Sequence, residues 1–358
     1  MDYAIRLITR KVNNIQLQAM RNSAILKKIC VSAMVLLGSG VLQSCSSIFE
    51  YEGDCSSNWR VDFRYDMNMK YADAFGHEAK AVTLYAFDSD GVLVWQKTEH
   101  GDTLATDDYA MTLDLAPGTY DLVAWSTCDK AIDCFAFPKV EEGKTTKPDL
   151  ICEMNRQRDE DGKAFSSRYL GSLMHGCIEN LEITEVEGTH TVRMPMVKNT
   201  NDVRIILQHL SGETVDHNVF TFSITDQNGI LSHDNTLLPC EEINYRPWRK
   251  ETISTSTGTR AITEVGALIA ELTLNRLMAG SDTKLEVFND KEETVLSIPL
   301  INYALMIKGH YDVMDDQEYL DRQDEYNMTF FLDDDMQWVS SHILINSWKV
   351  VLNDVDFD

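Results

Sequence analysis

Residues 82–95, VTLYAFDSDGVLVW, decide the fold class of this chain. β-Branched and aromatic residues lie on both sides of Asp88-Ser89-Asp90-Gly91, and such a combination is typical of a tight turn. The segment therefore predicts two antiparallel strands joined by that turn. The pattern recurs in MTLDLAPGTYDLVAW, residues 111–125, where Pro117-Gly118 separates a further pair of strands.

The second half of the chain repeats this plan. A strand, a turn and a returning strand are expected in FTFSITDQNGILS, residues 220–232, and a strand pair in ALIAELTLNRLMAGSDTKLEVF, residues 267–288. The first strand of this half is expected over residues 202–210, after a polar boundary at residues 198–201. We therefore predict an all-β chain with two similar antiparallel β-sandwich domains in tandem, residues 59–200 and 201–358.

The C-terminal segment has high β-propensity, and we expect one terminal strand over residues 343–355. A strand at the end of a chain can cover its own domain or pair with an open edge on another subunit. The candidate subunit contact consists of Ile343, Ile345, Trp348, Val350 and Leu352.

The N-terminal segment KKICVSAMVLLGSGVLQSC, residues 27–45, is typical of a bacterial lipoprotein signal. Two lysines precede an apolar run that is short for a membrane span, and Leu42-Gln43-Ser44-Cys45 follows as a lipobox. We expect a signal peptide over residues 1–44, with translation starting at Met20, and cleavage between Ser44 and Cys45. Cys45 would then carry diacylglycerol and a further acyl chain, and residues 45–58 would form a lipidated tether outside the cytoplasm.

The charge of the chain argues against two kinds of electrostatic partner. The formal net charge is −25, and the expected signal peptide contributes six basic residues against one acidic residue, so the mature chain is near −30. So acidic a surface disfavours nucleic acid and anionic lipid headgroups as electrostatic partners.

The sequence contains no recognisable catalytic constellation, so we expect neither an enzyme nor a metal or cofactor site. Its nine histidines are scattered, and it has no nucleophile elbow and no phosphate-binding loop. Asp88-x-Asp90-Gly91 is interpreted as a turn and not as part of a calcium loop. Among the cysteines, Cys55 paired with Cys128 or Cys134 is the expected disulfide.

Several segments occur in the order found in one known family. They are the cysteines Cys45 and Cys55, VDFRYDMN (61–68), VTLYAFDSDG (82–91), LAPGTYDLVAW (115–125), YLGSLMHG (169–176), VRIILQHL (203–210), FSITDQNG (222–229), YLDRQDEYNMTFFL (319–332) and INSWKVV (345–351). In this order they resemble the FimB-like minor fimbrial anchor subunits of Bacteroidales, which are lipoproteins of the fimbrillin superfamily. Ala81 departs from the pattern, because the family has a cysteine just before this strand.

The resemblance implies a transthyretin-like β-sandwich in each half and a role at the base of a fimbrium. An anchor of this kind is held in the outer membrane by lipid, is exposed at the surface, and contacts a fimbrillin-type shaft subunit. Shaft subunits lose their first strand and accept a neighbour's C-terminal segment, whereas an anchor would keep its first strand, here residues 60–66. Two alternatives stay open: a surface lipoprotein that binds a glycan or host ligand, and a fimbrial tip or accessory subunit.

Overall fold

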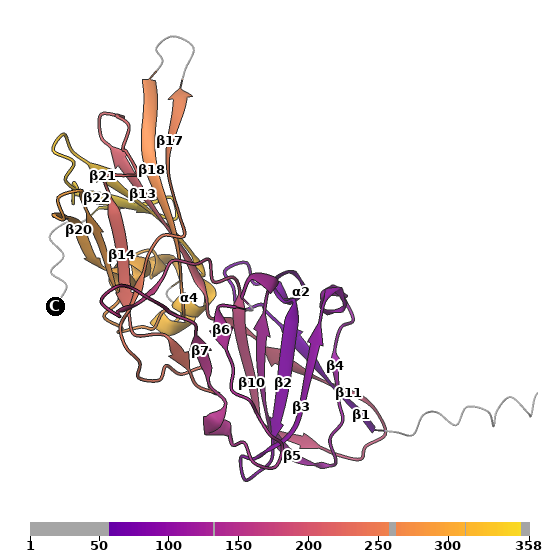
Figure 1. Ribbon diagram of the computed structural model, residues 1–358. Coiled ribbons are helices and arrows are strands. Elements are labelled where there is room, and N and C mark those ends of the chain that lie inside the picture. The colour runs from indigo at the N-terminus through magenta and orange to yellow at the C-terminus, as the bar shows by residue number, and fades with distance from the viewer. Residues whose placement is uncertain (1–56, 132, 258–262, 312, 352–358) are drawn as a thin grey trace, which may run out of the picture. The chain divides into compact units, whose positions relative to one another are not determined.

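The computed structural model describes residues 57–131, 133–257, 263–311 and 313–351 (Figure 1). Strands dominate both halves, and the helices are short. The fold confirms the predicted all-β chain of two tandem sandwiches.

The first sandwich consists of a five-stranded sheet, ordered β12-β10-β5-β2-β3, and a three-stranded sheet, ordered β11-β1-β4. Its strands are β1 (Ser57–Arg64), β2 (Ala81–Phe87), β3 (Leu93–His100), β4 (Met111–Leu113), β5 (Gly118–Thr127), β10 (Leu173–Ile183), β11 (Gly188–Pro195) and β12 (Val197–Lys198). Helix α2 (Phe75–Glu78) follows β1.

The second sandwich consists of two six-stranded sheets, ordered β17-β18-β13-β21-β22-β23 and β20-β19-β14-β16-β9-β8. The strands of the first of these sheets are β13 (Asn201–His209), β17 (Arg249–Thr257), β18 (Thr263–Leu274), β21 (Glu325–Leu332), β22 (His342–Ile345) and β23 (Trp348–Val351). The other sheet contains β8 (Gln157–Arg158), β9 (Ala164–Ser166), β14 (Thr221–Asp226), β16 (Ile243–Tyr245), β19 (Lys284–Phe288) and β20 (Thr294–Pro299). The helices α3 (Leu300–Leu305) and α4 (Asp316–Arg322) lie between β20 and β21 in the chain.

The two halves share one connectivity. In the first, β1 lies between the antiparallel β4 and the parallel β11. In the second, β13 lies between the antiparallel β18 and the parallel β21. The order β10-β5-β2-β3 likewise matches β20-β19-β14-β16. The strand pairing therefore supports the internal duplication that was expected from the repeated strand patterns.

The hairpin predicted from residues 82–95 forms as β2 and β3. Asp88 Oδ1 accepts hydrogen bonds from the backbone N–H groups of Asp90 and Val92 and so stabilises the turn. The pair expected at residues 111–125 does not form a hairpin, because β4 and β5 belong to different sheets. The same holds for β18 and β19 in residues 267–288. In both halves this connection crosses from one sheet to the other.

The strand–turn–strand expected at residues 220–232 is also wrong in its pairing. β14 pairs with β16 and β19, whereas β15 (Ile230–Leu231) pairs with β7 (Cys152–Met154) from the first half of the sequence. Asn228 ties the chain after β14 to the segment that follows β18: its buried amide donates to the carbonyls of Asn275 and Arg276, both at 3.1 Å. β7 also pairs with β6 (Phe135–Ala136), and β9 pairs with β16, so strands from before the expected boundary at residue 200 pair with strands from after it.

The C-terminal segment forms a hairpin instead of the single strand expected over residues 343–355. β22 and β23 are antiparallel and are joined by Asn346-Ser347, whose φ angles are 47° and 72°. Both central residues of a type I′ hairpin turn adopt such left-handed angles, which asparagine tolerates better than most residues. Residues 352–358 lie outside the described residues.

We expect Asn228→Ala to lower the free energy of unfolding by about 2–4 kcal/mol, because it takes a hydrogen-bond partner from the Asn275 and Arg276 carbonyls and from the buried Tyr245 hydroxyl. Urea denaturation measures this change. The exposed Asn218→Ala is the control and should stay within about 0.5 kcal/mol of the parent. Equal losses in the two variants would contradict the role given to Asn228.

Candidate functional site

Strand β1 completes the smaller sheet of the first sandwich. It pairs in parallel with β11 over its whole length, from Ser57 opposite Gly188 to Arg64 opposite Pro195. Its other edge pairs with β4 at three positions, Trp59 to Val61. Val61 and Phe63 point into the core and are 0% and 2% exposed. β1 therefore fills a groove between β4 and β11, and without it the core would be open to solvent.

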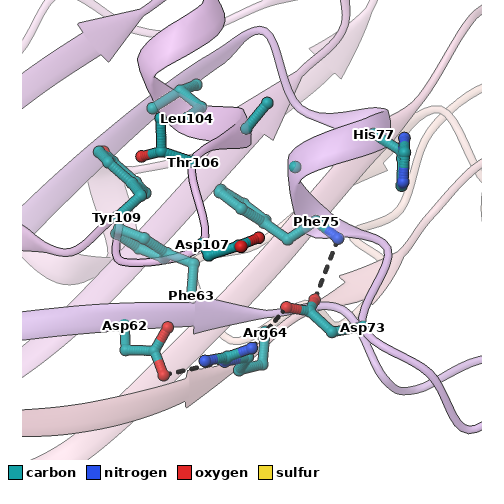
Figure 2. Close-up of a pocket in the computed structure, with 12 residues that line it drawn as sticks. Asp62, Phe63, Arg64, Asp73, Phe75, His77, Leu104, Thr106, Asp107 and Tyr109 are labelled. Atoms are coloured by element: carbon teal, nitrogen blue, oxygen red, sulfur yellow. Dashed lines mark hydrogen bonds and ion pairs between the residues drawn. The ribbon is translucent and has the colours of Figure 1, made fainter.

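A pocket of about 400 Å³ lies beside the part of β1 that continues past β4 (Figure 2). Aromatic rings line it: Phe63 stacks on Phe75 with ring centres 5.4 Å apart and lies 6.3 Å from Tyr109. Burial raises the pKa of the Tyr109 hydroxyl, so this group stays protonated. Asp62 and Asp107 add acidic groups to the lining.

Asp73 fixes the end of β1. The Arg64 guanidinium donates to Asp73 at 2.8 Å and to Asp62 at 2.9 Å (Figure 2). The other oxygen of Asp73 accepts from the backbone N–H groups of Tyr65 and Phe75 at 3.0 and 3.1 Å. These bonds hold the strand in the sheet as the chain turns into α2.

The predicted subunit-contact residues are divided between the core and the surface. Ile343 and Ile345 are 0% exposed in the core of the second sandwich. Trp348 is 51% exposed, Val350 is half-buried, and Leu352 lies outside the described residues. Among the described strands, β23 lies at one edge of its sheet and β17 at the other, so of the hairpin strands β23 and not β22 presents a backbone edge.

The backbone of Lys349 points away from β22. Ile345 and Trp348 flank the two-residue turn and therefore bond to each other across the hairpin. Hydrogen-bonding groups of successive residues point to opposite edges of a strand, so those of Lys349 face the outer edge.

Three residues of the expected sites lie outside the described residues. Ser44 and Cys45 form the expected cleavage and lipidation site, and Cys55 is one partner of the expected disulfide. Cleavage, lipidation and the disulfide thus stay predictions. Within the part of the chain that the structure describes, no helix is long and apolar enough to cross a membrane.

The two other cysteines of the expected disulfide lie close to Ser172 and Tyr169. Cys128 Sγ accepts from the Ser172 N–H at 3.1 Å, and Cys134 Sγ lies 3.7 Å from the Tyr169 carbonyl oxygen. Burial raises the pKa of the Cys134 thiol. No disulfide joins any two of Cys128, Cys152, Cys177 and Cys240.

Polar contacts between the sandwiches converge on Asp324, just before β21. Lys198 Nζ and the Tyr65 hydroxyl both donate to one Asp324 oxygen, each at 3.0 Å. Burial alone would lower the pKa of Lys198, but Asp324 and Glu78 raise it, so Lys198 stays charged. Sequence reasoning missed this cluster and interpreted residues 198–201 as a polar boundary, because its partners lie far apart in the chain.

His175 of β10 forms a second contact between the halves. Its Nε2 lies 2.8 Å from the His233 carbonyl oxygen, and its ring packs edge-on against Trp125 with centres 4.6 Å apart. The side chain is 3% exposed, and burial lowers the pKa of His175 to about 4.

A second pocket, of about 440 Å³, lies against the β17-β18-β13-β21 part of the six-stranded sheet that ends in β23. Tyr169 and Trp248 line it with rings edge to face and centres 5.2 Å apart, and Trp248 is 38% exposed. Arg204 and Glu271 pair at 2.6 Å beside them. Sequence reasoning missed Trp248, which lies between Pro247 and Arg249 and outside any alternating strand pattern.

Aspartate side chains stabilise the acidic turns by accepting hydrogen bonds from backbone N–H groups of the same turn. Asp333 Oδ1 accepts from the N–H groups of Asp335 and Gln337, as Asp88 does in its hairpin. In the described ranges, no group of three or more His, Cys, Asp or Glu side chains could hold a metal ion.

Comparison with known proteins places the chain beside fimbrial proteins. The model of the family "Fimbrillin-A associated anchor proteins Mfa1 and Mfa2" matches residues 51–354. The minor fimbrium anchoring subunit Mfa2 of Porphyromonas gingivalis is 22% identical over 236 residues, which are 64% of this chain and 68% of that protein.

Three solved structures are similar to this chain in fold. A candidate adhesin from Bacteroides thetaiotaomicron is 34% identical, with a TM-score of 0.74 over 84% of this chain and 100% of that chain. A candidate polysaccharide-binding protein of the same organism is 28% identical, with a TM-score of 0.71 over 83% of this chain and 99% of that chain. The fimbrial anchor protein Mfa2 of P. gingivalis shares the fold, at 16% identity and a TM-score of 0.61 over 84% of this chain and 100% of that chain.

Stability should fall as the pH drops from about 6.5 towards 4, because unfolded chains protonate His175 there and the folded chain does not. The stability that comes from keeping His175 neutral is fully present above pH 6.5. At pH 4.5 it should be lower by about 2–3 kcal/mol, and His175→Gln should remove that part of the pH dependence. Urea denaturation of both proteins at pH 7.5 and 4.5 measures it. Identical pH dependence would show that His175 is protonated in the fold.

Proposed function

The chain belongs to the family of Fimbrillin-A associated anchor proteins Mfa1 and Mfa2, and on this premise we propose that it is the lipid-anchored base subunit of a fimbrium. The family is one of fimbrial anchor subunits, so the chain is a structural subunit of a surface fimbrium and not an enzyme. The observation that carries the finer proposal is β1, which occupies its own groove and begins 12 residues after Cys45.

Lipid on Cys45 would make the attachment durable. Each buried acyl methylene contributes about 0.8 kcal/mol, so two or three long chains hold a protein in the outer membrane almost permanently. Because the lipidated residue lies so close to β1, the first strand stays joined to the membrane and is not available for exchange.

An occupied groove would end the polymer at this subunit. A donor strand gains affinity by bonding to free backbone edges and placing alternate side chains in pockets. In this chain β1 already bonds to β4 and β11, and Val61 and Phe63 fill the pockets. No incoming segment can use these sites unless β1 leaves, so growth stops here and polymer length is limited.

The contact with the last shaft subunit is assigned to the outer edge of β23. Ile343 and Ile345 belong to the core of this chain, so they support the hairpin instead of meeting a partner. Among the described strands, β23 lies at an edge of its sheet, and it carries the exposed Trp348 and Lys349. A partner strand that adds to this edge would extend the six-stranded sheet.

We expect Cys45→Ala to abolish labelling with radioactive palmitate and to move the protein and its fimbriae from the membrane fraction to the medium, because the lipid attachment is lost. Cys55→Ala is the matched control and should keep both label and attachment. Continued labelling of Cys45→Ala would refute the lipid site.

We expect Lys349→Pro to release fimbriae from the cell, because proline removes an N–H that points to the outer edge of β23. Its thermal stability should match that of Lys349→Ala, since no bond inside the hairpin is lost. The two variants are compared by counting fimbriae attached per cell. Equal attachment in both would place the shaft contact elsewhere.

One observation favours a second function, binding of a polysaccharide. The exposed Trp248 ring beside Arg204 and Glu271 combines an apolar face with directional polar groups, as a sugar ring requires. One structural relative is described as a candidate polysaccharide-binding protein. We expect at least one immobilised polysaccharide to retard the protein in affinity electrophoresis and Trp248→Ala to abolish the retardation. Equal mobility of both proteins on every polysaccharide tested would exclude this site.

A further inference from the structure

The parallel register of β1 and β11 sets how the first sandwich carries load. Ser57 at the start of β1 lies opposite Gly188, and Arg64 at its end lies opposite Pro195. The chain reaches Ser57 from the side of Cys45, and it leaves Pro195 towards β13, which begins at Asn201. The points where the chain enters β1 and leaves β11 are thus at opposite ends of one ladder.

Tension between these two points acts along the strands. Pulling on Ser57 draws β1 one way, and pulling on the chain after Pro195 draws β11 the other way. All the hydrogen bonds of the ladder then resist together, in shear, and the strands cannot separate one bond at a time. Side chains add to this resistance, because the Trp59 ring stacks on His190 across the ladder with centres 4.7 Å apart.

We propose that β1–β11 is a mechanical clamp that keeps the first sandwich folded while a fibre pulls on it. This inference deepens the proposed function and rests on it for the source of the tension, but the resistance itself is a property of the chain. The buried Val61 and Phe63 would have to slide out of the core with β1, so core packing opposes the same movement.

The second sandwich repeats the device. β13 runs parallel to β21, from Asp202 opposite Glu325 to His209 opposite Leu332. β13 begins where the load enters this half, and β21 is followed by the C-terminal hairpin, to which the shaft contact is assigned. Two ladders of the same geometry therefore lie in series between the lipid and the shaft.

A different attachment point would load the first sandwich differently. The end of β1 lies near Met196, whose N–H donates to the Arg64 carbonyl. Ala81, the first residue of β2, lies opposite Thr127 of β5, and Thr127 lies opposite Leu173 of β10. The Leu173 carbonyl in turn accepts a hydrogen bond from the Asn199 N–H. All these residues are at the end of the sandwich where the chain leaves it. Force applied between β1 and β2 would therefore peel β2 from its neighbours bond by bond.

The test compares two pulling points in otherwise matched proteins. Tyr51→p-azidophenylalanine and Tyr71→p-azidophenylalanine place the same handle before and after β1, and Tyr71 is 57% exposed. Each protein, from residue 46 to the C-terminus, is stretched in optical tweezers against a second handle after Asp358. Unfolding of the second sandwich is common to both and serves as the internal reference.

From Tyr71, we expect the first sandwich to unfold at a force lower by at least about twofold than from Tyr51, because unfolding under force follows the barrier in the direction of the pull. Equal unfolding forces from the two handles would overturn the clamp. That result would leave the anchor assignment untouched, because Cys45→Ala and Lys349→Pro test it separately.

Discussion

The pairing of β1 with β4 and β11 is the constraint on which the rest of the structure depends. β1 is the middle strand of the smaller sheet, so its removal would expose two backbone edges and the pockets of Val61 and Phe63. Because Asp73 and Arg64 fix its far end, the strand is held at both edges and at its end. A subunit built in this way is complete without a partner in its first sandwich.

Because the two halves share one connectivity, their strand pairing can be compared position by position. β4 pairs with β1 at three positions, whereas β18 pairs with β13 at eight, from Asn201 to Gln208. At the other side, β21 carries the hairpin β22–β23, and among the described strands β11 is the outermost of its sheet. The N-terminal half is therefore closed by the strand that follows the proposed lipid site, while in the described part of the C-terminal half β23 forms an edge of the sheet.

Much of this architecture could be predicted from local patterns, because alternation and turn residues report on neighbours in sequence. The hairpin at Asp88 and strand β13 were found in this way. Long-range pairing leaves no such signal: nothing in Ile230–Leu231 indicates that β7 is its partner, and nothing in Lys198 indicates that Asp324 lies beside it. The C-terminal hairpin was missed because Asn346-Ser347 interrupts a run of high β-propensity without a glycine or proline.

The proposed function depends most on whether β1 stays in its groove while the protein works. Asn58 and Thr189 are paired positions of β1 and β11 on the outward face, so Asn58→Cys/Thr189→Cys would lock the strand by a disulfide. We expect cells with the oxidised, locked protein to carry as many fimbriae, of the same length, as cells with the parent. Loss of fimbriae in the locked protein, restored by reducing agent, would contradict it, because β1 would then have to leave for a shaft segment to enter.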